Sequence, residues 1–157
     1  MLKKFFAIIL LSLLSAGINF LHAQVTEAVV GVDGFTCSLC AKGVEGQFKA
    51  LDFVKTVKTD LKKTQFTLSF RNNPGIRFTE IRDAVTDGGF SLREIDITAK
   101  GSLKTDGNTF YLLETKNSPE MNLKGVHGNF SNGEKVLVKG KIDASDNTVT
   151  ISSIEKL

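Results

Sequence analysis

The two cysteines of the chain are the residues with the clearest potential for chemistry. Cys37 and Cys40 are the only cysteines, and they lie within residues 34–40, which read Gly-Phe-Thr-Cys-Ser-Leu-Cys. A strand-like segment precedes them and a helix-like segment follows them. Both thiols are therefore expected on one side of a first helical turn, where residues i and i+3 are neighbours. The free N–H groups and the dipole of a helix start favour thiolates, and paired soft thiolates predict a site for a soft metal ion.

Cysteine pairs with this spacing also serve other chemistry. Reversible thiol–disulfide exchange and an inert disulfide are the two alternatives. A disulfide across two intervening residues closes a very small loop and restrains little of the unfolded chain, which argues against a purely structural crosslink. Zinc prefers four ligands in a closed site. A site with two thiolates favours ions that accept few ligands, such as Cu(I) or Hg(II).

The first 23 residues have the pattern of a secretory signal peptide. Lys3 and Lys4 precede a nearly unbroken apolar run over residues 5–14, and residues 21–23 (Leu-His-Ala) form a suitable cleavage site. The apolar run is short for a membrane span of about 20 residues, so we expect cleavage and no stable membrane insertion afterwards. The sequence therefore predicts an exported protein, either periplasmic or secreted.

The composition argues against several classes of function. Lys3 and Lys4 supply two of the three formal positive charges, so the rest of the chain is nearly neutral. This balance gives no reason to expect nucleic acid or an anionic membrane as a partner. No Ser-His-Asp set and no phosphate-binding glycine loop is visible in the sequence. We therefore expect a binding protein and not an enzyme.

Hydrophobic periodicity predicts the elements that position the cysteines. Apolar residues with periods of two or 3.6 indicate strands and helices, respectively, in the order β-α-β-β-α-β. The expected segments are strand 28–32, helix 39–51, strand 54–61, strand 65–70, helix 78–87 and strand 91–97. This order is the ferredoxin-like split βαβ arrangement, with both helices on one face of an antiparallel sheet. The cysteines then lie in the loop between the first strand and the first helix, at one end of the sheet.

Residues 98–157 have a different pattern. Short strands are indicated at residues 101–104, 109–114, 136–138 and 149–154, separated by turns rich in Gly, Asn and Asp. This pattern predicts a small β-barrel that resembles OB-like barrels, and the alternative is a β-rich extension packed on the first domain. The expected organisation of this α+β protein is a signal peptide at 1–23, a ferredoxin-like domain at 24–97 and a small all-β domain at 98–157.

Several residues of the ferredoxin-like segment match a family pattern. Residues 34–40 are similar to a Gly-Met-Thr-Cys-x-x-Cys loop, and Val44-Glu45 follow the second cysteine at the family's usual distance. The second helix and its end add matches at Ile81, Ala84, Val85 and Gly89-Phe90. With these flanks, residues 26–97 resemble the heavy-metal-associated domain of copper chaperones and metal-transporting ATPases.

The resemblance has implications for ligands and partners. It implies that Cys37 and Cys40 are the metal ligands, with Cu(I) as the first candidate. Phe35 would take a core place usually held by Met, and Phe90 would pack beneath the metal loop. A metal-transporting ATPase or another metal-trafficking protein would be the partner. A periplasmic mercury-binding protein of the same fold uses the same two cysteines, so Hg(II) stays an alternative.

The sequence thus predicts an exported soft-metal-binding protein, a copper chaperone or scavenger that holds its ion between Cys37 and Cys40. The alternatives are a periplasmic mercury-binding protein and an exported thiol–disulfide redox protein. A further alternative is an interaction module in which residues 98–157 carry the function.

Overall fold

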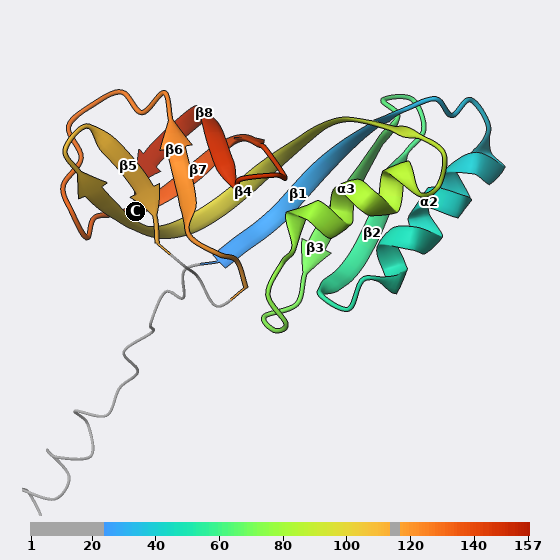
Figure 1. The fold of residues 1–157 in the computed structure, drawn as a ribbon, viewed down its shortest axis with the longest axis horizontal. Coiled ribbons are helices and arrows are strands. Elements are labelled where there is room, and N and C mark those ends of the chain that lie inside the picture. The colour runs from blue at the N-terminus through green and yellow to red at the C-terminus, as the bar shows by residue number, and fades with distance from the viewer. Residues whose placement is uncertain (1–23, 114–116) are drawn as a thin grey trace, which may run out of the picture.

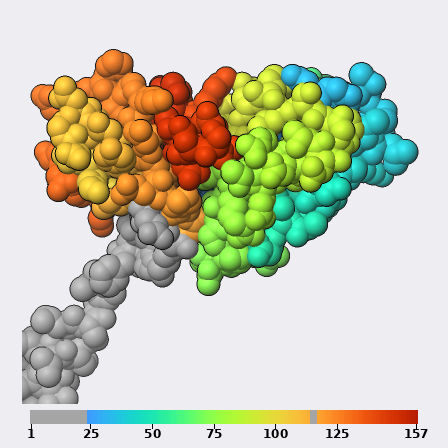
Figure 2. All heavy atoms as spheres, viewed as in Figure 1, coloured from blue at the N-terminus to red at the C-terminus, as the bar shows by residue number. Residues whose placement is uncertain are grey.

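An α+β lobe and an all-β lobe share one long strand in the computed structural model, which describes residues 24–113 and 117–157 (Figure 1). The signal peptide expected at residues 1–23 lies outside the described residues. Figure 2 shows the two lobes in contact. The elements in chain order are β1 (Gln24–Asp33), α2 (Ser38–Ala50), β2 (Val54–Asp60), β3 (Gln65–Phe70), α3 (Phe78–Thr86), β4 (Ser91–Asp106), β5 (Thr109–Leu112), β6 (Met121–Lys124), β7 (Lys135–Ile142) and β8 (Thr148–Lys156).

The first lobe has the predicted ferredoxin-like order. Its antiparallel sheet runs β2-β3-β1-β4, and α2 and α3 lie together on one face of it (Figure 1). Helix α2 buries Ala41, Val44 and Phe48, which recur at helical spacing. The rings of Phe48 and Phe66 meet with centroids 5.3 Å apart, so the helix and β3 share one aromatic core. The ferredoxin-like prediction is confirmed.

Strand β1 carries the chain from one end of this sheet to the other. It pairs with β4 from Gln24, opposite Lys100, to Asp33, opposite Ser91. The pairing of β4 with the second lobe begins at Asp96 and continues past Lys100 to Asp106, away from Ser91. The loop of residues 34–37 therefore lies at the end of the sheet that points away from the second lobe (Figure 1).

Strand β4 is longer than the sequence pattern predicts. We expected a strand at residues 91–97 and a separate one at residues 101–104, but one strand covers Ser91–Asp106. β4 pairs with β1 and, further along, with β5 on one edge, and with β7 on the other edge. The expected domain boundary after Ile97 thus falls inside a strand that both lobes share. A division into two independent domains stays a prediction.

The second lobe is a closed ring of five strands. β4 pairs with β5, β5 with β6, β6 with β8, β8 with β7, and β7 again with β4. All of these pairs are antiparallel except β6–β8, which is parallel. Leu103, Leu112, Met121, Val136 and Val138 fill the interior and have no exposed surface. The expected small barrel of OB-like type is therefore observed, and β6 is a strand that the sequence analysis did not predict.

A buried asparagine joins the two lobes. Asn117 lies between β5 and β6 and is 2% exposed. Its side-chain amide donates to the carbonyl of Val25 at 2.9 Å and accepts from the N–H of Val25 at 3.0 Å. Its own carbonyl accepts from the N–H of Ile76 at 2.7 Å. One residue of the barrel thus binds the start of β1 and the segment before α3.

Within the part of the chain that the structure describes, no helix is long and apolar enough to cross a membrane.

Candidate metal centre

Cys37 lies at the N-cap of α2. Its backbone is extended (φ −123°, ψ 150°), and its carbonyl accepts the first helical hydrogen bond from Ala41 at 3.2 Å. Its sulfur accepts a hydrogen bond from the N–H of Cys40 at 3.1 Å, as capping side chains do at a helix start. The chain passes from strand to helix at this cysteine, so Cys37 and Cys40 share the first turn as expected.

The two sulfurs are joined in a disulfide bond, with the Cα atoms of Cys37 and Cys40 5.4 Å apart. The sequence analysis expected a pair of thiolates, and the structure contains the oxidised pair. Metal ions bind the deprotonated, negatively charged thiolate, and the sulfurs of a disulfide are neutral. Metal binding at these sulfurs would therefore begin with reduction of the bond.

The disulfide is open to solvent on one side. Cys37 is exposed, whereas Cys40 is half-buried and packs against the hydrophobic core. A groove of about 320 Å³ runs beside Cys37 and is lined by Phe35, Thr36, Cys37, Ser38, Leu61 and Thr64. Leu39 and Leu61 are 77% and 50% exposed, a large fraction for apolar side chains. A second protein could therefore reach the sulfur of Cys37 without any rearrangement of the fold.

Comparison with known families identifies the lobe that carries this loop. Residues 29–91 match the family model of the heavy-metal-associated domain. This part of the chain is a heavy-metal-associated domain. The match includes both cysteines and leaves β5 to β8 outside it. No curated protein matches the chain.

Three similar solved structures each correspond to 43% of this chain. The CopZ metallochaperone is 21% identical, with 98% of its own chain covered and a TM-score of 0.40. The yeast copper transporter domain Ccc2a, solved in apo and Cu(I)-loaded states, is 24% identical, with 90% covered and a TM-score of 0.39. The N-terminal domain of PacS from Synechocystis PCC6803 is 19% identical, with 92% covered and a TM-score of 0.37.

Aromatic side chains support the cysteine loop of the heavy-metal-associated domain from below. Phe35 is buried, and its ring meets Phe66 at 5.7 Å and the edge of Phe90 at 6.0 Å between centroids. This arrangement agrees with the places that the family resemblance implied for Phe35 and Phe90. The residue two positions before Cys37 is thus held in the hydrophobic core by its contacts with two other aromatic rings.

We expect Phe35→Met to leave metal binding within about twofold and to lower the free energy of unfolding by less than about 1.5 kcal/mol. Met has a similar volume and adapts to irregular gaps in a core, and Phe35 offers no donor atom to a metal. The check is a urea denaturation curve together with a Cu(I) competition titration. A loss of binding in a folded variant would contradict a purely supporting role for Phe35.

Other side chains with soft donor atoms lie away from the cysteines. Met121 is fully buried on β6, in the barrel, and His127 is exposed in the loop after that strand. Among residues 24–113 and 117–157, no group of three or more His, Cys, Asp or Glu is placed to hold a metal ion. The candidate centre in the described chain thus consists of the two cysteines.

Two residues beside the loop were missed by the sequence analysis. Thr64, in the turn between β2 and β3, lines the groove together with Cys37. Arg93, near the start of β4, donates to Thr64 and to Asp33, the last residue of β1. No local motif marks either residue, because the fold brings them together from separate strands.

Proposed function

We propose that this protein binds a soft metal ion, Cu(I) in the first place, between the thiolates of Cys37 and Cys40, and exchanges it with another protein. The observation that carries the proposal is the placement of both sulfurs on the exposed first turn of α2 within a heavy-metal-associated domain. Soft thiolates select Cu(I) over harder ions. Two thiolates leave a Zn²⁺ ion short of the four ligands that it prefers.

Exposure of Cys37 supports transfer to a partner. A partner thiolate can approach from the groove and enter the coordination sphere before either protein cysteine leaves it, so the ion need not be released into water. We infer that the partner is a metal-transporting ATPase or another metal-trafficking protein. The role is one of binding and transfer, without enzymatic turnover. Hg(II) also accepts two thiolates, and a mercury-binding role is the alternative within the same chemistry.

Export is part of the proposal and rests on the leader pattern of residues 1–23. In a periplasmic or extracellular setting the empty pair would tend to oxidise, which is consistent with the disulfide between Cys37 and Cys40. Mass measurement of the protein recovered from the cell envelope tests the proposal. A mature N-terminus at Gln24 supports it, and a retained leader contradicts it.

The disulfide favours a second candidate function, thiol–disulfide exchange with a partner dithiol. An incoming thiolate would attack the exposed sulfur of Cys37, the S–S bond would break, and its electron pair would pass to the sulfur of Cys40, which takes a proton. The partner's second thiol would then release Cys37 as a thiol and close the partner's own disulfide. Multiple turnovers in a disulfide-exchange assay, with no preference for soft metals, would favour this candidate over metal transfer.

Competition with a colorimetric Cu(I) chelator, under anaerobic conditions, tests the metal proposal. We expect the fully reduced chain to withdraw one Cu(I) per chain from the chelator, and the disulfide form to withdraw none. Equal uptake by both forms would mean that the metal binds elsewhere. No uptake by the reduced form would contradict the proposal outright.

A further inference from the structure

A β-bulge places Arg93 on the open face of the sheet, beside the end of β1. The register of β1 with β4 shifts between the pairs Gly31–Glu94 and Val32–Leu92, so Arg93 is the extra residue on β4. Its guanidinium lies over Gly31, where an added Cβ would come within 2.9 Å of Nη2. A side chain at position 31 would therefore displace the guanidinium.

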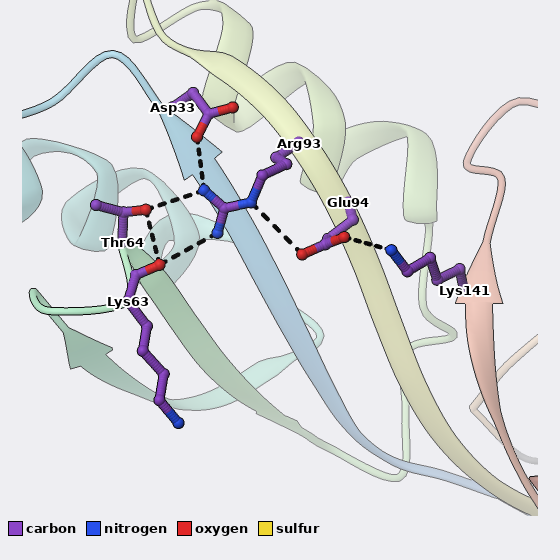
Figure 3. Close-up of polar contacts among 6 residues, drawn as sticks. All are labelled: Asp33, Lys63, Thr64, Arg93, Glu94 and Lys141. Carbon is purple, nitrogen blue, oxygen red and sulfur yellow. Dashed lines mark hydrogen bonds and ion pairs between the residues drawn. The ribbon is translucent and has the colours of Figure 1, made fainter. Parts of the chain in front are cut away.

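The guanidinium of Arg93 joins both segments that border the cysteine loop (Figure 3). Nη1 donates to Oδ1 of Asp33 at 2.6 Å and to Oγ1 of Thr64 at 3.0 Å. Nη2 donates to the carbonyl of Lys63 at 3.1 Å. Asp33 directly precedes the loop, and Thr64 lines the groove next to Cys37. One side chain thus holds the end of β1 against the turn between β2 and β3.

Thr64 has a backbone conformation that its residue type rarely adopts. Its φ is +50°, in the left-handed region, where a β-branched side chain is unfavourable. The conformation is held by the bond from Arg93 and by a second one, in which the N–H of Val32 donates to the carbonyl of Thr64 at 3.0 Å. Such strain persists where the surroundings over-determine it, and it is concentrated at functional sites.

The barrel reaches the same network through one ion pair. Lys141 on β7 donates to Oε2 of Glu94 at 2.5 Å, and Oε1 of Glu94 lies 3.5 Å from Nε of Arg93 (Figure 3). Asp96, opposite Lys141 in the register, is the other acidic residue near this pair. The hydrogen bond from Lys141, followed by the effect of Arg93, lowers the pKa of Glu94, so this carboxylate stays ionised at neutral pH. A chain of contacts therefore leads from the barrel to the border of the cysteine groove.

We infer that Arg93 is a positioning residue for the cysteine loop, and that the barrel steadies Arg93 through Lys141 and Glu94. The inference rests on the proposed metal function, because its consequence is a loop that is already ordered before the metal arrives. Residues that orient a metal site without touching the ion commonly change affinity by about 10–100-fold. Arg93 acts on the loop and not on a ligand atom, so we expect the lower end of that range.

The test compares Arg93→Gln with Arg93→Lys in the reduced, full mature chain. Arg82→Gln is the matched control, since Arg82 is similarly exposed and makes one ion pair, with Asp83. We expect Arg93→Gln to bind Cu(I) about tenfold more weakly than the wild type. The affinity of Arg93→Lys should lie between those of Arg93→Gln and the wild type, because an ammonium group keeps the charge but cannot reproduce the planar set of N–H donors of a guanidinium. Arg82→Gln should stay within twofold of the wild type. Equal Cu(I) affinities of Arg93→Gln and wild type would overturn the inference.

A metal-free readout separates this inference from the proposed function. Amide hydrogen exchange of residues 34–38 and 62–65 should be faster in reduced Arg93→Gln than in wild type, and unchanged in Arg82→Gln. If wild type binds no metal, the proposed function fails, while the exchange rates still test the positioning role. Unchanged exchange rates would overturn that role even if the variant binds metal more weakly.

Lys141→Gln tests the contribution of the barrel in a variant that should fold normally, since Lys141 is an exposed residue. We expect about threefold weaker Cu(I) binding, the usual size of one exposed ion pair, and no further loss when Lys141→Gln is combined with Glu94→Gln. The link to the barrel would be overturned if Lys141→Gln bound Cu(I) as tightly as the wild type. It would also be overturned if the losses of affinity from Lys141→Gln and Glu94→Gln were additive in the double variant. This variant also keeps the inference testable if Arg93→Gln does not fold.

Discussion

Cys37→Ser and Cys40→Ser are each expected to weaken Cu(I) binding by the reduced protein about a thousandfold. With both thiolates on one helical turn, the second sulfur meets an ion already held by the first, and such linked binding gains about 10²–10⁴ in affinity. A serine hydroxyl is a hard, neutral donor that does not replace a thiolate for Cu(I). The measurement is competition with a Cu(I) chelator, read at equilibrium for each variant.

Ser38→Ala is the matched control for the cysteine variants. Ser38 lies between the two cysteines, is exposed and lines the same groove. Its substitution should leave the affinity for Cu(I) within about twofold, since no thiolate is lost. If either cysteine variant stayed within tenfold of the wild type, the metal would not be held by this pair.

Asn117→Ala is expected to lower the free energy of unfolding by about 3 kcal/mol. The substitution removes two hydrogen bonds and leaves the buried N–H and carbonyl of Val25 without these partners. Each bond contributes about 1 kcal/mol, and each buried group left unpaired costs about 1–3 kcal/mol. The truncated side chain leaves a small cavity, and relaxation of the structure around it keeps the expected loss of stability near the lower end of the sum of these costs. Urea denaturation, followed by circular dichroism, gives the value.

Asn132→Ala provides the control for this prediction. Asn132 also accepts a backbone hydrogen bond, from Thr105 at 3.3 Å, but it is exposed, so water can replace the lost partner. Its substitution should cost less than about 1 kcal/mol. Because Asn117 joins the lobes at the end of the sheet remote from the cysteines, the folded fraction of Asn117→Ala should keep wild-type affinity for Cu(I). Equal costs for the two asparagine variants would mean that Asn117 does not join the lobes.

The ferredoxin-like lobe could be predicted because its signals are local. Phe66, Leu68 and Phe70 alternate along β3, and Ala41, Val44 and Phe48 repeat with the helical period in α2. Each element could therefore be assigned from its own residues. The ends of α2, β2, β3 and α3 differ from the predicted ones by at most one position, whereas β1 begins four residues earlier than predicted and β4 ends nine residues later. The cysteines could be placed for the same reason, since the loop and the first helical turn are adjacent in sequence.

The closure of the barrel could not be predicted, because it depends on contacts between distant strands. Gly101 lies in β4 where an added Cβ would come within 2.7 Å of the Leu112 side chain, and Gly140 lies in β7 where it would come within 2.3 Å of the Thr150 carbonyl. In the sequence these glycines indicate turns or strand ends. In the fold they allow close approach inside continuous strands. The strand predicted at residues 91–97 was too short for this reason.

Arg93 and Thr64 could not be predicted for a related reason. Their importance comes from a bulge in the β1–β4 pairing and from a turn whose conformation is held by a side chain on another strand. Neither the bulge nor the left-handed Thr64 has a local sequence signal, and Thr is an uncommon residue at positive φ. The residues that position a loop are thus harder to predict than the residues that do its chemistry.

Native mass spectrometry of the mature chain, offered Cu(I), Hg(II) and Zn(II) together, tests the central claim most directly. The account predicts that the reduced chain takes up one Cu(I) or Hg(II) ion and excludes zinc, and that the chain with the Cys37–Cys40 disulfide takes up no metal. Cu(I) in the bound peak would support the copper assignment over mercury. Zinc in the bound peak, or metal bound by the disulfide form, would contradict a site made of two soft thiolates.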